Sequence, residues 1–209
     1  APVNPDSQRQ LKQMQQSWKG AKGLAADVRF YGQWMQKEAI KSIGHLYPKV
    51  TITHEMVKDR PEIRHYEGRS LTVIAWLWAR TVRCPSPGCA NEMPLLSSCV
   101  LSSKVGHESY LHPVISKGKI TFNVKKEPPE GKVDVKKGFK RGLSGIFQCA
   151  FCGTVTTRNY VAQQAIAIGL GSIQTAVVLE ADRGRMYLPA ECSPLPDDIP
   201  RVDTSDLET

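Results

Sequence analysis

Two long apolar stretches with different spacings dominate the first half of the chain. From Trp18 to Leu46, apolar side chains recur at steps of three and four residues, which places them on one face of an α-helix. The positions are Leu24, Val28, Tyr31, Met35, Ala39 and Ile43. The pattern predicts an amphipathic helix, and Gly44 and Pro48 fit its C-terminal end.

The second stretch, from Ser70 to Arg83, is the most apolar part of the sequence and predicts a β-strand. It is rich in β-branched and aromatic residues, which favour strands, and its near-continuous hydrophobicity indicates partial burial on both faces. Between the helix and this strand, residues 51–68 are polar and show no clear period, so we expect a connector there.

The middle of the chain predicts short strands followed by a loop. Apolar and polar residues alternate over 119–124, which indicates a strand that pairs with another over 110–115. A strand over 93–101 is expected to return from the end of the long strand. Residues 127–145 contain two prolines and four glycines, and this composition is typical of a loop.

The last third of the chain predicts one helix and two strands. The helix is expected over 158–168 and ends at Gly169. Strands are expected over 173–180 and 186–188, separated by a turn.

Four of the six cysteines form two close pairs. Cys84 and Cys89 enclose Pro-Ser-Pro-Gly, while Cys149 and Cys152 enclose Ala-Phe and precede a glycine. Both segments suit tight turns, because proline presets φ and glycine allows positive φ. Two such turns can supply four thiolates at about 2.3 Å from one tetrahedral zinc ion. We predict an α+β fold, with the N-terminal amphipathic helix and a small antiparallel β domain that is zinc-ribbon-like and binds structural Zn²⁺.

The sequence leaves other roles open for these cysteines. Cys149 and Cys152 can instead form a disulfide or a redox pair. A redox pair typically opens a helix in a βαβ unit, whereas residues 153–157 predict one arm of a β-hairpin. A site with four cysteines leaves no open coordination position, so a catalytic role for the metal is not indicated.

The remaining cysteines and two histidines have simpler interpretations. Cys99 lies in an apolar segment and is expected to be a small buried thiol, and Cys192 is expected to be a free thiol. His107 and His112 flank a tyrosine and are alternative zinc ligands that would compete with the cysteine pairs.

Charge is unevenly distributed along the 209 residues, whose net charge is +8. The segment 117–141 holds nine Lys and Arg residues against three acidic residues. A basic patch beside a zinc site suits contact with DNA phosphates, although solvated flexible loops often carry similar charge. The candidate contacts are Lys125, Lys126, Lys136, Lys137, Lys140 and Arg141, and the secondary candidates are Arg80 and Arg83.

Composition also bounds the compartment. No apolar run approaches the roughly 18 residues of a membrane span, so no membrane partner is expected. The N-terminus is polar and lacks a secretory signal, and cysteines of metal-binding type then favour the cytoplasm. Because the first residue is not Met, we expect a piece excised from a longer protein.

The patterns divide the chain into four regions. A polar arm is expected over 1–17, and the helical segment with its connector over 18–69. The zinc-ribbon-like β domain is expected over 70–189, with the basic insert at 117–141. Residues 190–209 contain six acidic residues, one arginine and several prolines, so we expect a disordered linker.

Several segments occur together in a distinctive combination. They are Gly20–Gly32 (GAKGLAADVRFYG), Ile43–Pro48 (IGHLYP), Val73–Val82 (VIAWLWARTV), the two cysteine turns and Asp182–Pro189 (DRGRMYLP). In this combination, over roughly residues 2–189, the chain resembles a group of large bacterial and archaeal proteins. These are described as adenine-specific DNA methyltransferases that carry an N-terminal domain of unknown function.

The resemblance implies that the chain is part of a larger enzyme. In that family a Gly-rich S-adenosylmethionine loop precedes this region and an Asp-Pro-Pro-Tyr catalytic motif follows it, and neither occurs in this sequence. The chain would be a zinc-bearing middle portion, with S-adenosylmethionine bound only in the full-length enzyme. The implied partners are DNA and the remainder of the methyltransferase, and no catalytic or cofactor-binding residue is assigned.

Two functions are compatible with these observations. An accessory module would contact the DNA that the enzyme must hold while an adenine is turned out of the stack. A structural zinc brace would instead dock on another protein surface through the apolar helix and the strand that carries Trp76 and Trp78. Independent catalysis is not indicated, because the sequence shows no nucleophile with a base and no open metal site.

Overall fold

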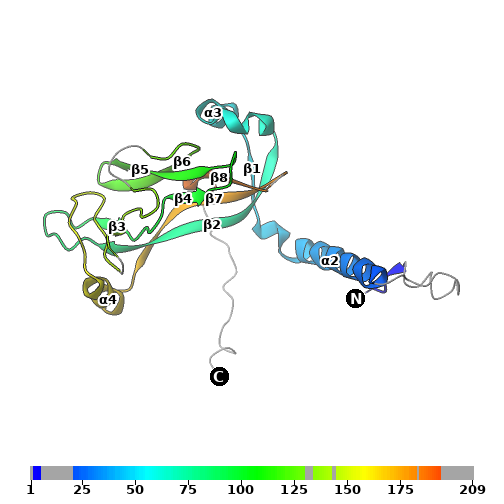
Figure 1. Cartoon of the computed structure of the whole chain (residues 1–209), viewed down its shortest axis with the longest axis horizontal. Coiled ribbons are helices and arrows are strands. Elements are labelled where there is room, and N and C mark those ends of the chain that lie inside the picture. Colours follow the sequence, from blue (N-terminus) through cyan, green and yellow to red (C-terminus); the bar gives the residue numbers. More distant parts are fainter. Residues whose placement is uncertain (1, 6–20, 130–133, 143–144, 183, 194–209) are drawn as a thin grey trace, which may run out of the picture. The chain divides into compact units, whose positions relative to one another are not determined.

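The computed structural model describes residues 2–5, 21–129, 134–142, 145–182 and 184–193 (Figure 1). The chain divides into two compact units, one comprising residues 1–47 and 199–209 and the other residues 48–198. Helix and strand contents of 30% and 36%, antiparallel sheets and a long N-terminal helix confirm the predicted α+β class. None of the helices in the described ranges is long and apolar enough to cross a membrane.

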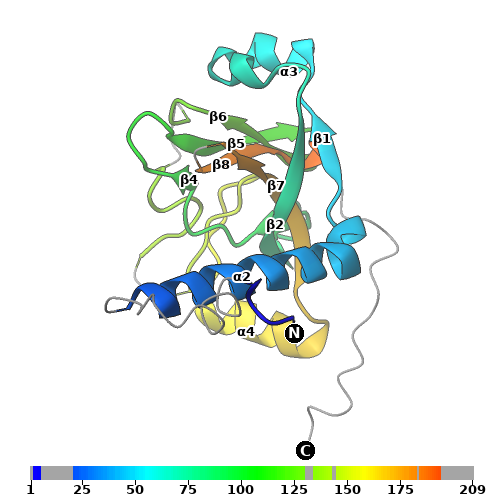
Figure 2. The same ribbon diagram turned by 90° about the vertical axis from the view of Figure 1, so that its right-hand side faces the viewer.

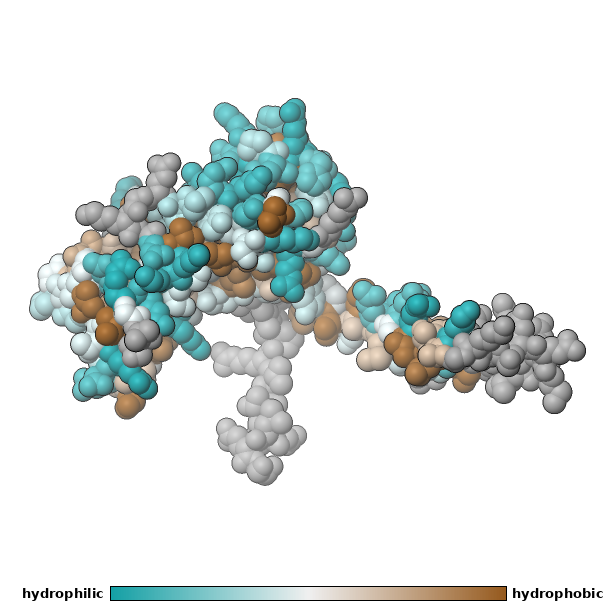
Figure 3. Space-filling view, in the orientation of Figure 1, coloured by the Kyte–Doolittle hydropathy of each residue, from teal (hydrophilic) through white to brown (hydrophobic). Residues whose placement is uncertain are grey.

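The first unit contains the helix α2 (Lys22–Ile43), which continues into the short 3-10 helix η1 (Gly44–Leu46). The amphipathic helix is confirmed over this range, while its expected start at Trp18 lies outside the described residues, as does the polar arm from residue 6 to residue 17. No residue of α2 is buried. Apolar side chains gather along one side of this helix in Figure 3, and Leu24 is 69% exposed.

The second unit is built around a five-stranded antiparallel sheet in which the order is β1-β2-β7-β8 and β3 also pairs with β2. The strands are β1 (Lys49–Thr51), β2 (Ser70–Arg83), β3 (Glu92–Pro94), β7 (Gly171–Ala181) and β8 (Gly184–Pro189). The predicted long strand is confirmed as β2. Register shifts against β7 between Val73 and Ala75 and between Leu77 and Trp78 change which face the following side chains occupy. This is why β2 buries side chains on both faces.

A second, three-stranded sheet has the order β4-β5-β6. Its strands are β4 (Val100–Ser102), β5 (Ser109–Ser116) and β6 (Lys119–Lys125). The predicted hairpin is confirmed, and its two-residue turn has positive φ at both Lys117 (49°) and Gly118 (73°), as a type I′ turn requires. The apolar side chains of β6 are buried and the alternating polar ones are exposed.

One continuous strand over 93–101 was the wrong expectation. The chain leaves the first sheet after Pro94 and joins the second sheet at Val100. Pro94 has no N–H to extend the ladder, and the Ser98 hydroxyl accepts a hydrogen bond from the Val100 N–H at 3.0 Å, which forms a local turn. The segment therefore links two sheets and does not form one strand.

The polar connector over 51–68 was also wrong in part, because it contains two short helices. These are α3 (His54–Asp59) and the 3-10 helix η2 (Pro61–Tyr66). Thr53 caps α3, and Val57 and Ile63 are buried in the core formed by β2, β7 and β8. A helix of six residues is too short to give a periodic signal, so tertiary packing decides its structure.

A second core lies between the two sheets. It contains Cys99, Leu111, Ile120, Phe122, Val124, Phe139 and Ala176. Cys99 is fully buried, as predicted, and burial raises the pKa of its thiol to about 11. The loop described over 134–142 closes this core, since the Cys99 N–H donates to the Val135 carbonyl at 2.8 Å.

The end of the described chain is more ordered than the sequence suggested. The short helix η3 (Ala190–Cys192) and Ser193 pack against the sheet, and the Ser193 carbonyl accepts hydrogen bonds from Trp76 Nε1 and Gln174 Nε2. The expected linker is therefore wrong for residues 190–193, and its remainder, 194–209, lies outside the described residues. Cys192 is a free, partly buried thiol.

The helix α4 (Arg158–Ala167) confirms the predicted helix, and it lies at the end of the second unit opposite α3 (Figure 2). Thr157 caps it by accepting the Tyr160 N–H at 3.2 Å, and the Tyr160 hydroxyl donates to the Arg83 carbonyl at 3.0 Å. The cap therefore helps to hold α4 against the end of β2.

We expect Thr157→Ala to lower the free energy of unfolding by about 1 kcal/mol, because the Tyr160 N–H loses its partner. Urea denaturation, with an unchanged slope, measures this effect. Thr157→Ser keeps the hydroxyl and is the matched control. Equal losses in both variants would show that the cap does not stabilise the unit.

Candidate metal centre

Two turns from distant parts of the sequence bring four thiols together. The Sγ atoms of Cys84, Cys89, Cys149 and Cys152 all lie within 4.8 Å of one another. Cys84 Sγ is 3.6 Å from Cys152 Sγ, and Cys89 Sγ is 3.9 Å from Cys149 Sγ. A tetrahedron with metal–sulfur bonds of about 2.3 Å has edges of about 3.8 Å. The cysteine cluster therefore has the size that one tetrahedral metal ion needs.

The first turn is attached directly to the end of β2. The Cys84 N–H donates to the Asn91 carbonyl at 2.9 Å, and the Cys89 N–H donates to the Ser86 carbonyl at 3.0 Å. Ala90 adopts a positive φ of 48°, which turns the chain back toward β3. Asn91 Nδ2 also lies 3.5 Å from Cys89 Sγ as a hydrogen-bond donor. The turn thus fixes both thiols and supplies a donor to one of them.

The second turn is a tight loop that precedes α4. The Cys149 N–H donates to the Thr154 carbonyl at 2.8 Å, and the Gly153 N–H donates to the Cys149 carbonyl at 3.0 Å. Gly153 has a φ of 79°, a conformation that favours glycine. Gln148 pairs with Val155 across the loop, which agrees with the expected hairpin arm. No helix begins at Cys152, unlike the redox arrangement considered from the sequence.

The cluster has a buried side and an exposed side. Cys84 and Cys149 are buried with Val82 and Met93 in a small apolar core, and Cys152 is exposed. Burial raises the pKa of Cys84 to about 12. The hydroxyl and the N–H of Thr154 lower the pKa of Cys152 to about 6. Cys152 is therefore the cysteine of the cluster that loses its proton most readily.

Backbone N–H groups also donate hydrogen bonds to the buried sulfurs of Cys149 and Cys84. Burial raises the pKa of Cys149, and the N–H groups of Cys152 and Phe151 oppose this by donating to its sulfur. The Ser86 N–H acts in the same way on Cys84. Such donors stabilise thiolates over thiols, as metal binding requires.

Sequence reasoning missed two residues that contact the sulfurs. Asn91 donates to Cys89, and Thr154 Oγ1 lies 3.3 Å from Cys152 Sγ. Each is a polar residue two positions after the second cysteine of its turn, which is the signal that the sequence offered.

The alternative ligands His107 and His112 lie outside the cluster, whose members are all cysteines. His112 Nε2 is 2.7 Å from the Glu127 carbonyl oxygen. His107 lines a separate cavity with Arg60 and Tyr187. Metal ions are commonly held by groups of three or more His, Cys, Asp or Glu side chains. Among the described residues, the four cysteines are the one group of this kind.

The basic candidates occupy two different places. Lys136, Lys137 and Lys140 belong to the loop beside the second cysteine turn, since Lys140 pairs with Phe147 just before that turn. Lys137 Nζ forms a 3.2 Å ion pair with Asp134. Lys125 and Lys126 lie instead at the end of β6 that is distant from its hairpin turn. The candidates therefore come from two segments, the end of β6 and the loop over 134–142.

The last candidate, Arg141, is largely occupied by its own neighbourhood. Its Nε donates to Gln148 Oε1 at 2.9 Å, and its Nη1 donates to the Lys140 carbonyl at 3.2 Å. These contacts connect the loop to the second cysteine turn and leave the guanidinium less free for a phosphate. The secondary candidates Arg80 and Arg83 form hydrogen bonds through their backbone carbonyls. The Arg80 carbonyl accepts the Leu95 N–H, and the Arg83 carbonyl accepts the Tyr160 hydroxyl.

Comparisons with known proteins give no relative for this arrangement. No protein-family model, no curated protein and no solved structure matches the chain.

Proposed function

We propose that the four cysteines hold one structural zinc ion. The observation that carries this proposal is the set of Sγ separations, which match a tetrahedral site. Thiolate ligands in tetrahedral geometry suit zinc better than the oxygen-preferring divalent ions. All four positions are filled by protein, so the ion would connect the end of β2 to the segment before α4 and would not bind a substrate.

We further propose that the chain is a zinc-binding accessory domain of an adenine-specific DNA methyltransferase and contacts DNA phosphates. The supporting observations are the sequence resemblance and the lysines of the loop beside the second cysteine turn, of which Lys136 is exposed and Lys140 half-buried. Lys136 and Lys140 are the best candidates, because Lys137 is paired with Asp134 and Arg141 is held by Gln148. Such contacts position a protein on DNA without reading its sequence.

The second candidate function is a structural brace that docks on another protein surface. It is favoured by exposed apolar side chains, since Met35 and Ile40 of α2 are 62% and 61% exposed and Trp78 of β2 is 47% exposed. In the methyltransferase interpretation, the remainder of the enzyme would cover these faces.

Zinc content and duplex affinity, measured on one preparation of the chain, distinguish the two proposed functions. We expect elemental analysis to give one zinc per chain and duplex affinity to fall steeply with salt. Combining Lys136→Gln with Lys140→Gln should flatten the slope of log affinity against log salt by about 0.9 for each lost contact. Lys58→Gln in α3, at the opposite end of the unit, is the control and should leave the slope unchanged. Zinc without duplex binding would favour the brace, and absence of zinc would contradict both proposals.

A further inference from the structure

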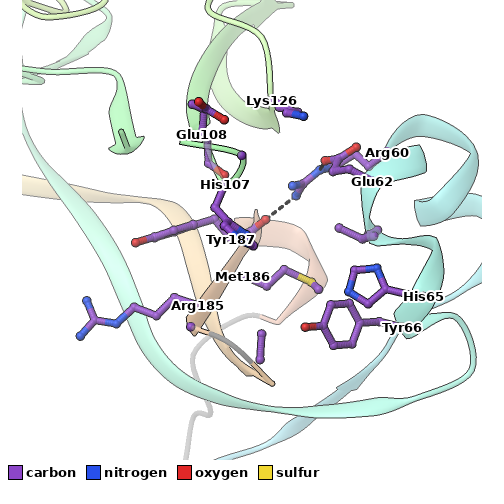
Figure 4. Close-up of a pocket in the computed structure, with 15 residues that line it drawn as sticks. Arg60, Glu62, His65, Tyr66, His107, Glu108, Lys126, Arg185, Met186 and Tyr187 are labelled. Carbon is purple, nitrogen blue, oxygen red and sulfur yellow. Dashed lines mark hydrogen bonds and ion pairs between the residues drawn. The ribbon is translucent and has the colours of Figure 1, made fainter. Parts of the chain in front are cut away.

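A groove distant from the cysteine cluster combines basic side chains with an aromatic ring. Its deeper part is a cavity of about 220 Å³ between η2, the turn before β5 and the strand β8 (Figure 4). A second cavity of about 240 Å³ adjoins it. His107, Gly184, Arg185 and Tyr187 line both cavities, so the two form one continuous groove.

The groove carries an excess of positive charge. Lys126 lines the deeper cavity, Lys104 lines the outer one and Arg185 lines both. Arg60 is nearly buried, but its guanidinium already binds Glu62 and the Tyr187 carbonyl, as Figure 4 shows for the latter. Besides Glu62, the acidic residue that lines the groove is Glu108, and the three exposed basic side chains outnumber it.

Glu108 is the acidic side chain that opposes an anionic ligand in this groove, and backbone N–H groups and Lys126 partly offset its charge. Its pKa is lowered first by hydrogen bonds from its own N–H and the Gly106 N–H, with contributions from Lys126 and His107. The carboxylate is therefore turned toward the backbone, and Lys126 is close enough to interact with it. An anionic ligand can replace that weak interaction at an exposed lysine.

The aromatic ring proposed to act in the groove is that of Tyr187, which lines both cavities and is half-buried because it also packs against the second core. Its backbone carbonyl is held by Arg60, and its side chain lies beside His107 in the close-up (Figure 4). The other tyrosine that lines the groove, Tyr66, is already engaged, because Arg69 lies 5.0 Å from its ring centroid and His65 lies 4.0 Å away on a tilted plane. Tyr187 is thus a ring held by the core and by Arg60, beside exposed basic side chains.

We propose that this groove binds a short stretch of single-stranded nucleic acid, with one base stacked on Tyr187 and the adjacent phosphates contacted by Lys126, Arg185 and Lys104. An aromatic platform flanked by cations is the combination by which proteins bind single strands without sequence preference. The two small cavities have room for a base and a phosphate and not for a large cofactor. The inference goes beyond the duplex contacts proposed above and does not require the metal centre.

The aromatic part of the proposal is tested with a labelled oligothymidylate of about ten nucleotides, which covers the usual site size. We expect Tyr187→Leu to weaken binding about tenfold or more, because stacking is lost. Tyr187→Phe keeps the ring and should stay within about twofold of the unaltered chain. A melting temperature for each variant separates loss of binding from loss of folding. Equal weakening in both folded variants would overturn the stacking role.

The charged part is tested by the salt dependence of the same binding. Lys126→Gln and Arg185→Gln should each flatten the slope of log affinity against log salt by about 0.7, the value for one single-strand phosphate. Lys119→Gln, at the opposite end of β6, is the matched control and should not change it. No oligothymidylate binding at low salt, or free thymidine monophosphate binding as tightly as the oligomer, would overturn the proposal. Duplex affinity and zinc content are measured separately, so this failure is distinguishable from failure of the proposed function.

Discussion

Replacing Cys149 with serine is expected to remove stoichiometric zinc and to lower the melting temperature by about 10 °C or more. Metal that binds the folded state at about 1,000 times its dissociation constant contributes about 4 kcal/mol, and about 2–4 °C is lost per kcal/mol in a chain of this size. Cys149 is 2% exposed and packs with Val82, Cys84 and Met93. Serine ligates zinc poorly, and burying its hydroxyl beside Val82 and Met93 costs free energy that the thiol does not, so both losses add.

Cys192→Ser is the control, because Cys192 is a free, partly buried thiol outside the cluster. It should keep one zinc per chain and a melting temperature close to that of the unaltered chain. Elemental analysis and thermal unfolding on the same samples measure both quantities. If Cys149→Ser retained full metal content and stability, the assignment of the metal centre would be wrong.

The size of this effect follows from where the cluster sits in the chain. The paired sulfurs join residues 68 and 60 positions apart, so the ion would close two long loops of the sequence at one point. The apolar core around the cysteines has four buried residues, whereas the other two cores of the described residues have eleven and seven. The metal would supply to this end of the unit the stabilisation that apolar burial supplies elsewhere.

The sequence predicted the features that depend on local spacing. The steps of three and four residues predicted α2, the alternation over 119–124 predicted β6, and the paired cysteines predicted the cluster. In each case the period or the turn residues are determined by neighbours within a few positions, so the pattern survives in the sequence.

The features that the sequence did not reveal depend on contacts between distant residues. The short helices α3 and η2 become stable because they cover the core of the first sheet. Arg69, which follows the expected polar connector, forms a bidentate ion pair with Asp182 at 2.7 and 2.8 Å, across 113 positions of sequence. The groove beside Tyr187 likewise combines residues from four separated segments, and no short motif connects them.

Replacing Gly138 with alanine is expected to lower the free energy of unfolding of the second unit by about 2–4 kcal/mol. Gly138 has a φ of 53°, where an alanine costs about 1–2 kcal/mol on its own. A Cβ there would lie 2.7 Å from the Leu96 carbonyl oxygen and 3.1 Å from the Ser98 nitrogen, which are backbone atoms that cannot rotate away. The same carbonyl accepts the Phe139 N–H at 2.9 Å, and that bond holds the loop on the core.

Gly68→Ala is the control that separates the cost of the backbone conformation from the cost of the steric clash. Gly68 has a φ of 76°, and no atom lies within 4 Å of the position that an alanine methyl group would take, so this variant should show the conformational cost alone. Urea denaturation of both variants gives the difference. The loop that Gly138→Ala displaces includes Phe139, whose carbonyl accepts the N–H of Gln148, the residue before Cys149. Zinc affinity should therefore fall in Gly138→Ala and stay unchanged in Gly68→Ala. If the two variants had equal free energies of unfolding and equal zinc affinities, the loop over 134–142 would not support the metal centre.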